Sequence, residues 1–165
     1  MTLKKIWAPW RIDYIENPKK EDGCFFCKYP KEEDDKKRFI LYRGKNTFII
    51  MNYYPYTNGH LMIAPYKHVS ELSDLDNDTK IEIMNLIQKC TYILKEVMKA
   101  EGFNIGINIG PVAGAGVKDH LHVHIVPRWT GDTNFMPIFG NTKIISEGLQ
   151  QTWEKLHKEF DHIDN

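Results

Sequence analysis

Three histidines, His120, His122 and His124, alternate with apolar residues in the stretch 120–126. Strict alternation is typical of a half-buried β-strand, in which every second side chain lies on the same face. The pattern therefore predicts a strand that carries three imidazoles on one face and apolar side chains on the other. A solvated strand face usually carries Thr, Lys or Glu, so three imidazoles together indicate a chemical site.

Strand geometry limits what these histidines can do together. Neighbours on one face lie about 6.6–6.8 Å apart, so the outer two histidines are roughly 13 Å apart at their backbones. Two adjacent histidines can bind one metal ion at about 2 Å, whereas all three on one ion would require a sharp bend. The roles should therefore divide and leave at least one imidazole for metal-independent chemistry. With an ordinary pKa of about 6.5, such an imidazole has a free nitrogen at neutral pH and is available as a nucleophile.

A second group of reactive residues begins at Cys24 and Cys27, whose spacing is that of one half of a tetrahedral zinc site. Two further ligands are required. Spacing alone does not choose them among the seven histidines, which are His60, His68, His120, His122, His124, His157 and His162. The alternative interpretation is that both cysteines are small apolar residues of a core. Cys90 lies on the apolar face of a predicted helix and is expected to pack there.

Hydrophobic patterning predicts the elements that position these residues. Strands separated by turn signals are expected at 39–43, 47–51, 60–64, 104–108 and 121–126. A long helix is expected over 78–100, with Asp76 or Asp78 as its N-cap and Gly102 just past its end. A C-terminal helix is expected from the spacing of Ile145, Leu149, Trp153, Leu156 and Phe160. Strands and helices without βα alternation favour an α+β fold with a mainly antiparallel sheet.

The composition predicts one globular domain over residues 1–165. Lys and Arg together number 22, as do Asp and Glu, so the net charge of zero argues against a nucleic-acid partner. The sequence has no apolar run of membrane-spanning length and no signal-peptide pattern, which argues against a membrane partner. The expected compartment is cytoplasmic, where a Cys-x-x-Cys pair favours metal binding over a disulfide.

Two further blocks, together with the histidine run, resemble the histidine triad (HIT) family. The stretch 52–65 resembles the family's strand–loop–strand, with an Asn, a Gly-His pair and an apolar strand that ends in Pro. The stretch 108–116 resembles its Gly-rich phosphate loop, and the matching blocks span about residues 24–128. The resemblance implies a HIT-like fold with a five-stranded sheet, a long helix and a C-terminal helix. It also implies a homodimer and a nucleotide substrate.

The resemblance assigns the metal ligands. Zinc-bearing bacterial members place the two remaining ligands at a histidine shortly after the Gly-His strand and at the first histidine of the triad. These positions are His68 and His120 here. Together with Cys24 and Cys27 they would hold one structural zinc per chain, because four protein ligands leave no position for water.

The resemblance also assigns the chemistry. The family's middle histidine is the nucleophile, which implies that His122 attacks an α-phosphate and forms a nucleotidyl-histidine. The expected substrate-binding residues are Asn52, His60, Asn108, Gly114, Gly116 and His124. Backbone N–H groups of the Gly-rich loop can hold phosphate oxygens without a cation, and the substrate could carry Mg²⁺. Asn52 could instead cap a turn, and His60 could close the start of a strand.

Two outer segments, 7–11 and 129–135, resemble the bacterial branch that includes diadenosine tetraphosphate phosphorylases. The favoured function is therefore cleavage of a dinucleoside polyphosphate, with phosphate or water as the final acceptor. The sequence departs from the common pattern at 113–117, which has no hydroxyl or amide side chain, and at the additional residue Asp119. This departure weakens the case for phosphorylase activity. The alternatives are a nucleoside phosphoramidate hydrolase, a hydrolytic zinc centre and a nucleotide-binding sensor without turnover.

Overall fold

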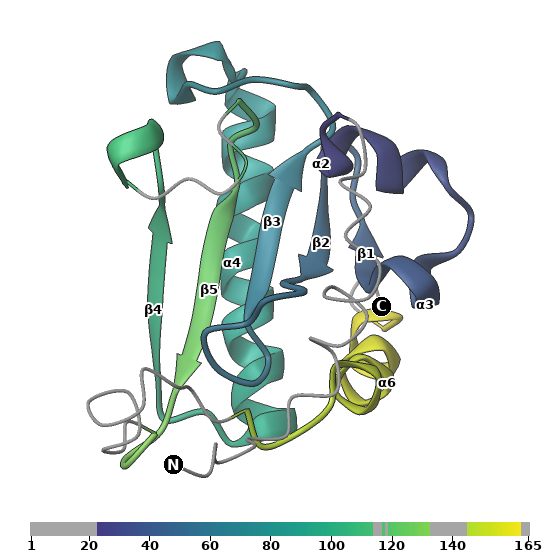
Figure 1. Cartoon of the computed structure of the whole chain (residues 1–165), viewed down its shortest axis with the longest axis vertical. Coiled ribbons are helices and arrows are strands. Elements are labelled where there is room, and N and C mark those ends of the chain that lie inside the picture. The colour runs from purple at the N-terminus through teal and green to yellow at the C-terminus, as the bar shows by residue number, and fades with distance from the viewer. Residues whose placement is uncertain (1–22, 114–116, 118, 133–144, 163–165) are drawn as a thin grey trace, which may run out of the picture.

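The computed structural model describes residues 23–113, 117, 119–132 and 145–162. Its centre is an antiparallel five-stranded sheet with the strand order β1-β2-β3-β5-β4 (Figure 1). The strands are β1 (Ile40–Arg43), β2 (Thr47–Met51), β3 (Leu61–Pro65), β4 (Gly102–Ile107) and β5 (Val123–Arg128). The α-helices are α2 (Phe25–Lys28), α3 (Asp35–Arg38), α4 (Asn77–Met98) and α6 (Leu149–Phe160). The predicted α+β fold is confirmed.

Each predicted strand is present, with small shifts at its ends. The shift that matters for function is at β5, which begins at Val123 rather than at residue 121. The reason is a contact outside the sheet, because the N–H of Leu121 donates to the carbonyl of Val69 at 2.7 Å. Residues 120–122 therefore approach β5 without belonging to it.

The long helix α4 begins where its predicted cap lies. The carboxylate of Asp76 accepts a hydrogen bond from the N–H of Thr79 at 2.7 Å, which satisfies one of the free N–H groups of the first turn. The end of α4 differs from the prediction, because Lys99 adopts the left-handed conformation (φ 54°) as C-cap and Gly102 opens β4 instead. No helix in the described part of the chain is long and apolar enough to cross a membrane.

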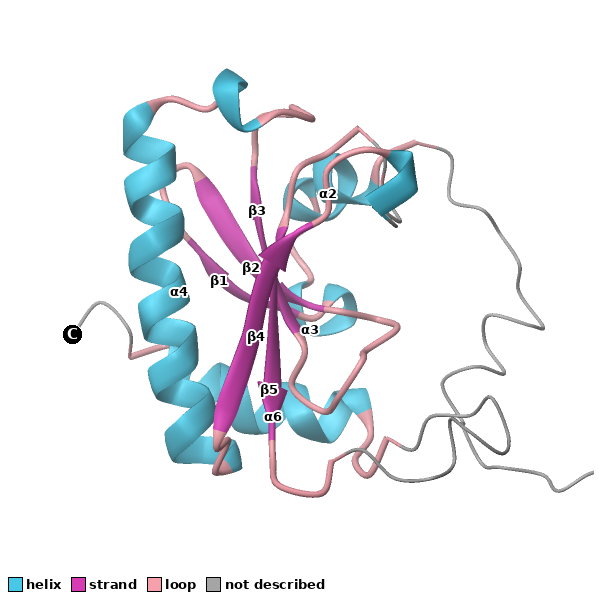
Figure 2. Ribbon diagram, turned by 90° about the vertical axis from the view of Figure 1, so that its left-hand side faces the viewer, coloured by secondary structure: helices cyan, strands magenta, loops and turns pink. Residues whose placement is uncertain are grey.

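The helices lie on two sides of the sheet. Figure 2 shows α4 along one face, with α2 and α3 on the opposite side. The larger core lies between α4 and the sheet, and buried Cys90 packs there as predicted. A smaller cluster on the other face holds α2 against the sheet, through Phe26, Phe48, Ile50, Met62 and their neighbours. Packing of α2 therefore brings Cys24, its N-cap, and Cys27, within the helix, to the sheet face opposite α4.

Candidate functional site

The three histidines of the stretch 120–124 do not all belong to the sheet. Only His124 lies within β5, and His120 and His122 lie in the approach to it. The prediction that one strand carries all three is therefore wrong. The predicted alternation holds, because the apolar residues of the run lie in the core beside α4, while His120 and His122 contact Phe26 on the other face. His120 and His122 are 1% and 3% exposed, and His124 is partly buried. The hydrogen bond from Leu121 N–H to the carbonyl of Val69 holds the approach to β5 outside the sheet, so the three imidazoles have different neighbours.

The structure brings together the four residues predicted as metal ligands. The sulfur and nitrogen atoms of Cys24, Cys27, His68 and His120 all lie within 4.8 Å of one another. Nδ1 of His120 is 3.2 Å from Cys24 Sγ, 3.5 Å from Cys27 Sγ and 3.2 Å from His68 Nδ1. His68 Nδ1 is also 3.2 Å from Cys27 Sγ. Two thiols and two imidazoles form a donor set that suits tetrahedral zinc.

Pro65 determines which nitrogen of His120 faces the sulfur atoms. The Nε2 atom of His120 lies 2.8 Å from the carbonyl oxygen of Pro65. A carbonyl oxygen only accepts, so Nε2 carries the proton and Nδ1 has a bare lone pair directed at the cluster. Metal-binding histidines are commonly oriented in this way, with the second ring N–H donated to a carbonyl. The cluster therefore fits a metal ion in its donor atoms and in the orientation of His120.

His122 has the opposite protonation pattern. Its Nδ1 lies 2.8 Å from the carbonyl oxygen of His120, so Nδ1–H donates and Nε2 keeps a bare lone pair. Burial lowers the pKa of His122, against the opposing effect of this hydrogen bond. The ring of Phe26 packs on the imidazole, with centroids 4.8 Å apart. His122 is thus a neutral imidazole at neutral pH, held by one nitrogen and bare at the other, which is the state that a nucleophile requires.

The protonation of His124 follows from His60. The backbone N–H of Tyr56 donates to His60 Nδ1 at 3.1 Å, so a neutral His60 carries its proton on Nε2. Nε2 of His60 lies 2.9 Å from His124 Nδ1 and donates to it, which leaves the proton of His124 on Nε2. Burial, followed by the nearby His122, lowers the pKa of His124 to about 4, so the ring is neutral at neutral pH.

The ring centroids of His122 and His124 lie 4.7 Å apart, and the Nε2 atoms of the two rings offer complementary groups. His122 offers the bare lone pair of Nε2, and His124 offers an Nε2–H donor. A lone pair beside a donor can attack an electrophile while charge on a departing atom is stabilised. This arrangement needs no metal at the reacting atoms.

The remaining predicted residues have mixed outcomes. Asn52 does cap a turn, because its Oδ1 accepts from the N–H of Tyr54 at 2.9 Å, and its Nδ2 also lies 3.3 Å from His60 Nδ1. His60 closes the start of β3 and also contacts His124, and its role in substrate binding stays a prediction. Asn108 follows β4, two residues beyond the partner of His124 in that strand. Outside the described residues lie Gly114, Gly116 and the segments 7–11 and 133–135.

Two residues of the site were not predicted from the sequence. Phe26 is fully buried and contacts both His120 and His122, at centroid distances of 5.2 and 4.8 Å. Tyr56 stacks on His60 at 4.7 Å and lies 6.1 Å from His124. A sequence signal existed for each, since Phe26 lies between the two cysteines and Tyr56 lies between Asn52 and His60.

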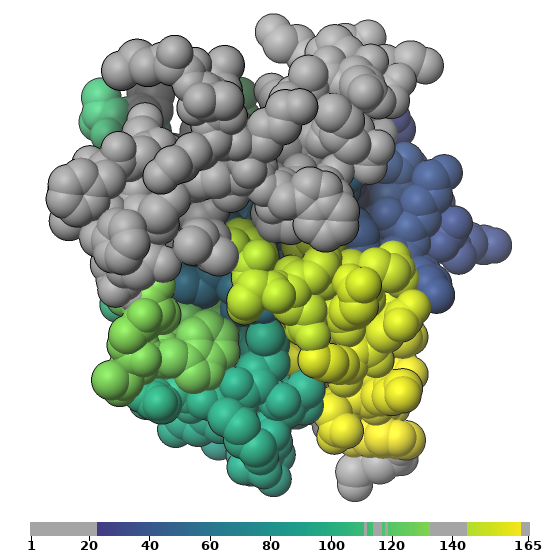
Figure 3. Space-filling model, turned by 60° about the horizontal axis from the view of Figure 1, so that its bottom comes forward, coloured from purple at the N-terminus to yellow at the C-terminus, as the bar shows by residue number. Residues whose placement is uncertain are grey.

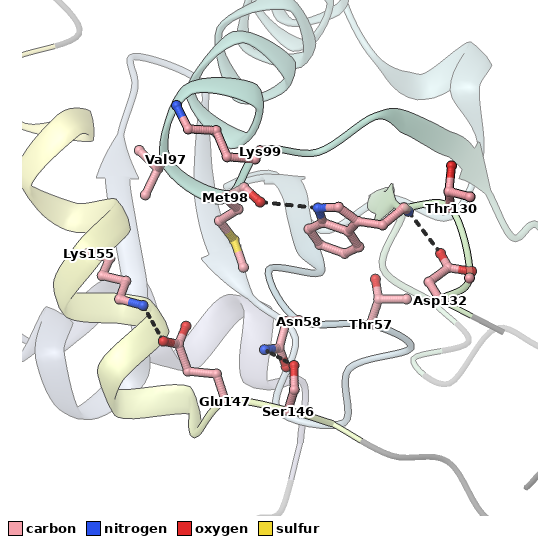
Figure 4. Close-up of a pocket in the computed structure, with 12 residues that line it drawn as sticks. Thr57, Asn58, Val97, Met98, Lys99, Thr130, Asp132, Ser146, Glu147 and Lys155 are labelled. Carbon is pink, nitrogen blue, oxygen red and sulfur yellow. Dashed lines mark hydrogen bonds and ion pairs between the residues drawn. The ribbon is translucent and has the colours of Figure 1, made fainter. Parts of the chain in front are cut away.

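A separate hollow of about 640 Å³ lies at the C-terminal end of α4. Figure 3 shows this side of the molecule, where α6 and the end of α4 meet, and Figure 4 shows the lining residues. Its polar groups pair with one another, Lys155 with Glu147 and Asn58 with Ser146. The hollow contains none of the predicted site residues. The chemistry is therefore concentrated at the histidines.

Comparison with known proteins gives a consistent result. A family model described as the HIT domain matches residues 33–131. The chain is 40% identical over 166 residues to an AP-4-A phosphorylase of Mycobacterium tuberculosis. The alignment covers 96% of this chain and 85% of the relative. It is 32% identical over 108 residues to a bis(5'-nucleosyl)-tetraphosphatase of Schizosaccharomyces pombe. This alignment covers 66% of this chain and 56% of the relative.

A solved structure agrees with the sequence relatives. The crystal structure of a Zn-bound histidine triad family protein from Mycobacterium smegmatis superposes with a TM-score of 0.68 at 25% identity. The alignment covers 86% of this chain and 96% of that chain. The resemblance predicted from the sequence motifs is confirmed, and the chain belongs to the HIT family.

Proposed function

We propose that this protein cleaves a dinucleoside polyphosphate at an α-phosphate through a nucleotidyl-His122 intermediate. The observation that carries the proposal is the pair of complementary tautomers, a bare Nε2 on His122 beside an Nε2–H on His124. Two relatives support this substrate class, since one is named AP-4-A phosphorylase and the other bis(5'-nucleosyl)-tetraphosphatase.

The proposed reaction has two steps. First, His122 Nε2 forms a bond to the α-phosphorus, and the bond from that phosphorus to the bridging oxygen breaks. The Nε2–H of His124 donates a hydrogen bond to the bridging oxygen as its negative charge develops. The carbonyl of His120 stabilises the positive charge on the attacking ring through Nδ1–H. Second, an acceptor attacks the same phosphorus, and His122 departs as a neutral imidazole.

Inorganic phosphate is the favoured acceptor, and water is the alternative. The 40% identity to a protein named phosphorylase supports phosphate. The absence of a hydroxyl or amide side chain at 113–117 argues for water, because phosphorolysis requires a second phosphate to be ordered in the site. Backbone N–H groups can order a phosphate without a side chain, which leaves phosphate the better candidate. Gly114 and Gly116 stay predictions for this contact.

The test uses diadenosine tetraphosphate labelled at its α-phosphates. Rapid quenching should recover label on the wild-type protein and none on His122→Ala. With millimolar phosphate we expect ADP and ATP, whereas AMP and ATP under both conditions would identify a hydrolase. If the dinucleotide is not cleaved but adenosine phosphoramidate releases AMP, the protein is a phosphoramidate hydrolase. Tight binding without label or products would make it a sensor.

We propose that Cys24, Cys27, His68 and His120 hold one structural zinc ion. The donor set and the orientation of His120 support the site, as does the Zn-bound relative from Mycobacterium smegmatis. Zinc there would supply a cross-link between α2 and the approach to β5. Because the carbonyl of His120 holds Nδ1–H of His122, fixing His120 also fixes the nucleophile. The metal therefore acts through the backbone and has no contact with the reacting phosphate in this proposal.

We infer that the protein forms a homodimer through α4 and β4. Ile81, Met84 and Tyr92 are each more than half exposed and lie on the side of α4 opposite to its buried residues. β4 is an edge strand, and its Ile105 is also exposed. A second copy of the chain would cover the apolar face and close the strand edge. Light scattering should give twice the chain mass for the wild type and the chain mass for a Met84→Lys, Tyr92→Lys variant.

Two further proposals concern the surroundings of the enzyme. Mg²⁺ would enter with the polyphosphate, since the group of potential metal ligands found among the described residues is the Cys/His cluster, which suits zinc. We keep the cytoplasm as the expected location, because Cys24 and Cys27 are free thiols that a reducing compartment would preserve.

A further inference from the structure

The loop between β2 and β3 contacts the catalytic histidines through Tyr56. Its backbone N–H donates to His60 Nδ1 at 3.1 Å. Its ring stacks on the same imidazole, with centroids 4.7 Å apart and an interplanar angle of 29°, and lies 6.1 Å from His124. His60 itself is 1% exposed. One residue therefore provides a hydrogen bond to the edge of His60 and covers its face.

The hydrogen bond from Tyr56 determines what His124 can do. A neutral imidazole has one N–H and one bare nitrogen, and its neighbours decide which is which. If His60 carried its proton on Nδ1, its Nε2 would be bare and would accept from Nδ1–H of His124. The Nε2 atom of His124 would then be bare as well, and could not donate to a departing oxygen. The proton position on His60 is thus transmitted to the group that His124 presents.

The ring of Tyr56 protects this protonation pattern. Tilting of His60 would lengthen the 2.9 Å contact between its Nε2 and His124 Nδ1. Water at Nδ1 would offer a competing partner that accepts as readily as it donates. The stacked ring restricts the imidazole plane and covers one face of it, and the burial of His60 behind this loop keeps water from its edge. Asn52 assists from the other side, with Nδ2 at 3.3 Å from His60 Nδ1.

We propose that Tyr56 is a positioning residue whose stacked ring keeps His60 protonated on Nε2 and so keeps His124 a hydrogen-bond donor toward the leaving group. This inference rests on the proposed function for its catalytic consequence. Its structural content, the proton positions on His60 and His124, stands independently of the substrate.

The first test is nitrogen NMR of histidine-labelled protein, since the ¹⁵N shifts of an imidazole identify its protonated nitrogen. The wild type should show Nε2–H on both His60 and His124. Tyr56→Leu retains the backbone N–H but loses the ring, and both residues should become mixtures of the two neutral forms. Tyr56→Phe should keep the wild-type pattern, because the ring and not the hydroxyl is responsible. Tyr54→Leu is the matched control, since Tyr54 lies on the same loop and its backbone N–H to Asn52 is preserved.

The second test compares three leaving groups. Diadenosine tetraphosphate, a phosphoramidate of AMP and the 4-nitrophenyl ester of AMP share the attacked nucleotide, but the amine must gain a proton to depart, whereas 4-nitrophenolate departs as a weakly basic anion. The Tyr56→Leu variant should lose about tenfold in kcat on the phosphoramidate, because its amine leaving group requires the donor most. The loss of kcat on the dinucleotide should be smaller. On the nitrophenyl ester the variant should lose little. A purely structural defect would lower the three rates equally.

The outcomes separate this inference from the proposed function. Wild-type nitrogen shifts in Tyr56→Leu, or equal losses of rate on all three substrates, would overturn the role of Tyr56. Loss of activity or of the Nε2–H pattern in Tyr56→Phe would overturn it as well, by assigning the role to the hydroxyl. Failure to find label on His122 in the wild type would instead refute the proposed function and leave the NMR result standing. If Tyr56→Leu does not fold, Tyr56→Phe and the wild-type shifts still decide whether the stated proton positions exist.

Discussion

The two ends of the histidine run use the same side chain for different purposes. At both ends the proton lies on Nε2 and the bare nitrogen is Nδ1. At His120 the bare nitrogen faces two sulfur atoms and a second imidazole, whereas at His124 it faces the N–H of His60. The first set of neighbours suits a metal ion, and the second keeps a neutral donor in place. The neighbour of the bare nitrogen, rather than the place in the motif, therefore decides the chemistry of each histidine.

His122 connects the two ends. Its Nδ1–H is held by the backbone carbonyl of His120, and its ring lies 4.7 Å from that of His124. Substitutions at the His120 end should therefore displace His122 through the backbone and lower both stability and activity. Damage at the His124 end should lower activity while stability at neutral pH stays nearly unchanged. The following experiments separate these effects.

The largest effect is expected at the residue between the two ends. His122→Ala should lower kcat on diadenosine tetraphosphate by about 10⁴-fold or more, because it removes the proposed nucleophile. Zinc content should stay close to wild type, and the melting temperature should fall modestly because the buried ring no longer packs on Phe26. His162→Ala, at an exposed position in the C-terminal region, is the control and should behave as the wild type. A His122→Ala enzyme with a tenth of the wild-type rate would exclude the covalent mechanism.

The next effect is expected at the His124 end. His124→Gln should lower kcat by about 10²- to 10³-fold, since one donor to the departing oxygen is lost. The zinc content should be unchanged, because His124 is not among the clustered ligand atoms. Stopped-flow rates and metal analysis on the same preparation provide the measurement. Loss of zinc in this variant would show that the two ends are not independent.

The sequence predicted which residues gather near His120 and near His124, but it did not predict that His120 and His122 lie outside β5. The strands follow from apolar alternation, which is a local property of the chain, and the four clustered residues follow from the resemblance to the family. The departure of His120 and His122 from β5 could not be predicted, because it depends on Val69 and Pro65, which are distant in sequence. For the same reason the protonated nitrogen of each histidine became accessible only with the structure. The burial of Phe26 against two histidines is likewise a tertiary property.

A smaller loss of activity is expected from damage at the His120 end. Wild-type protein prepared without chelator should contain about one zinc per chain, and Cys24→Ser should contain little. Its melting temperature should fall, and its kcat should fall by about 10- to 100-fold as the support for His122 loosens. Cys90→Ser is the matched control, because Cys90 lies on α4 in the core between this helix and the sheet and outside the cluster. This variant should lose stability but keep zinc. If chelation abolishes turnover at once without lowering the melting temperature, the site is a hydrolytic zinc centre.

The smallest effect is expected from acid, which should lower stability through protonation of His124 and, separately, through loss of the metal near His120. The pKa of His124 is lowered to about 4 by burial and by the adjacent His122, and an unfolded histidine has a pKa of about 6.5. Between these values the unfolded chain binds more protons than the folded one, so the free energy of unfolding falls as the pH falls from about 6.5 to about 4. Above pH 6.5 this contribution to stability is fully present.

Acid also removes a metal from the His120 end, because thiolates and imidazoles must be deprotonated to bind it. The two routes can be separated in Cys24→Ser, which should already lack zinc. In that background, the drop in melting temperature between pH 7 and pH 5 should become smaller when His124→Gln is added, since Gln does not titrate and its amide can still accept from His60. Equal drops with and without the second substitution would mean that His124 is not held as a buried neutral imidazole, and the contrast between the two ends would then rest on the metal cluster alone.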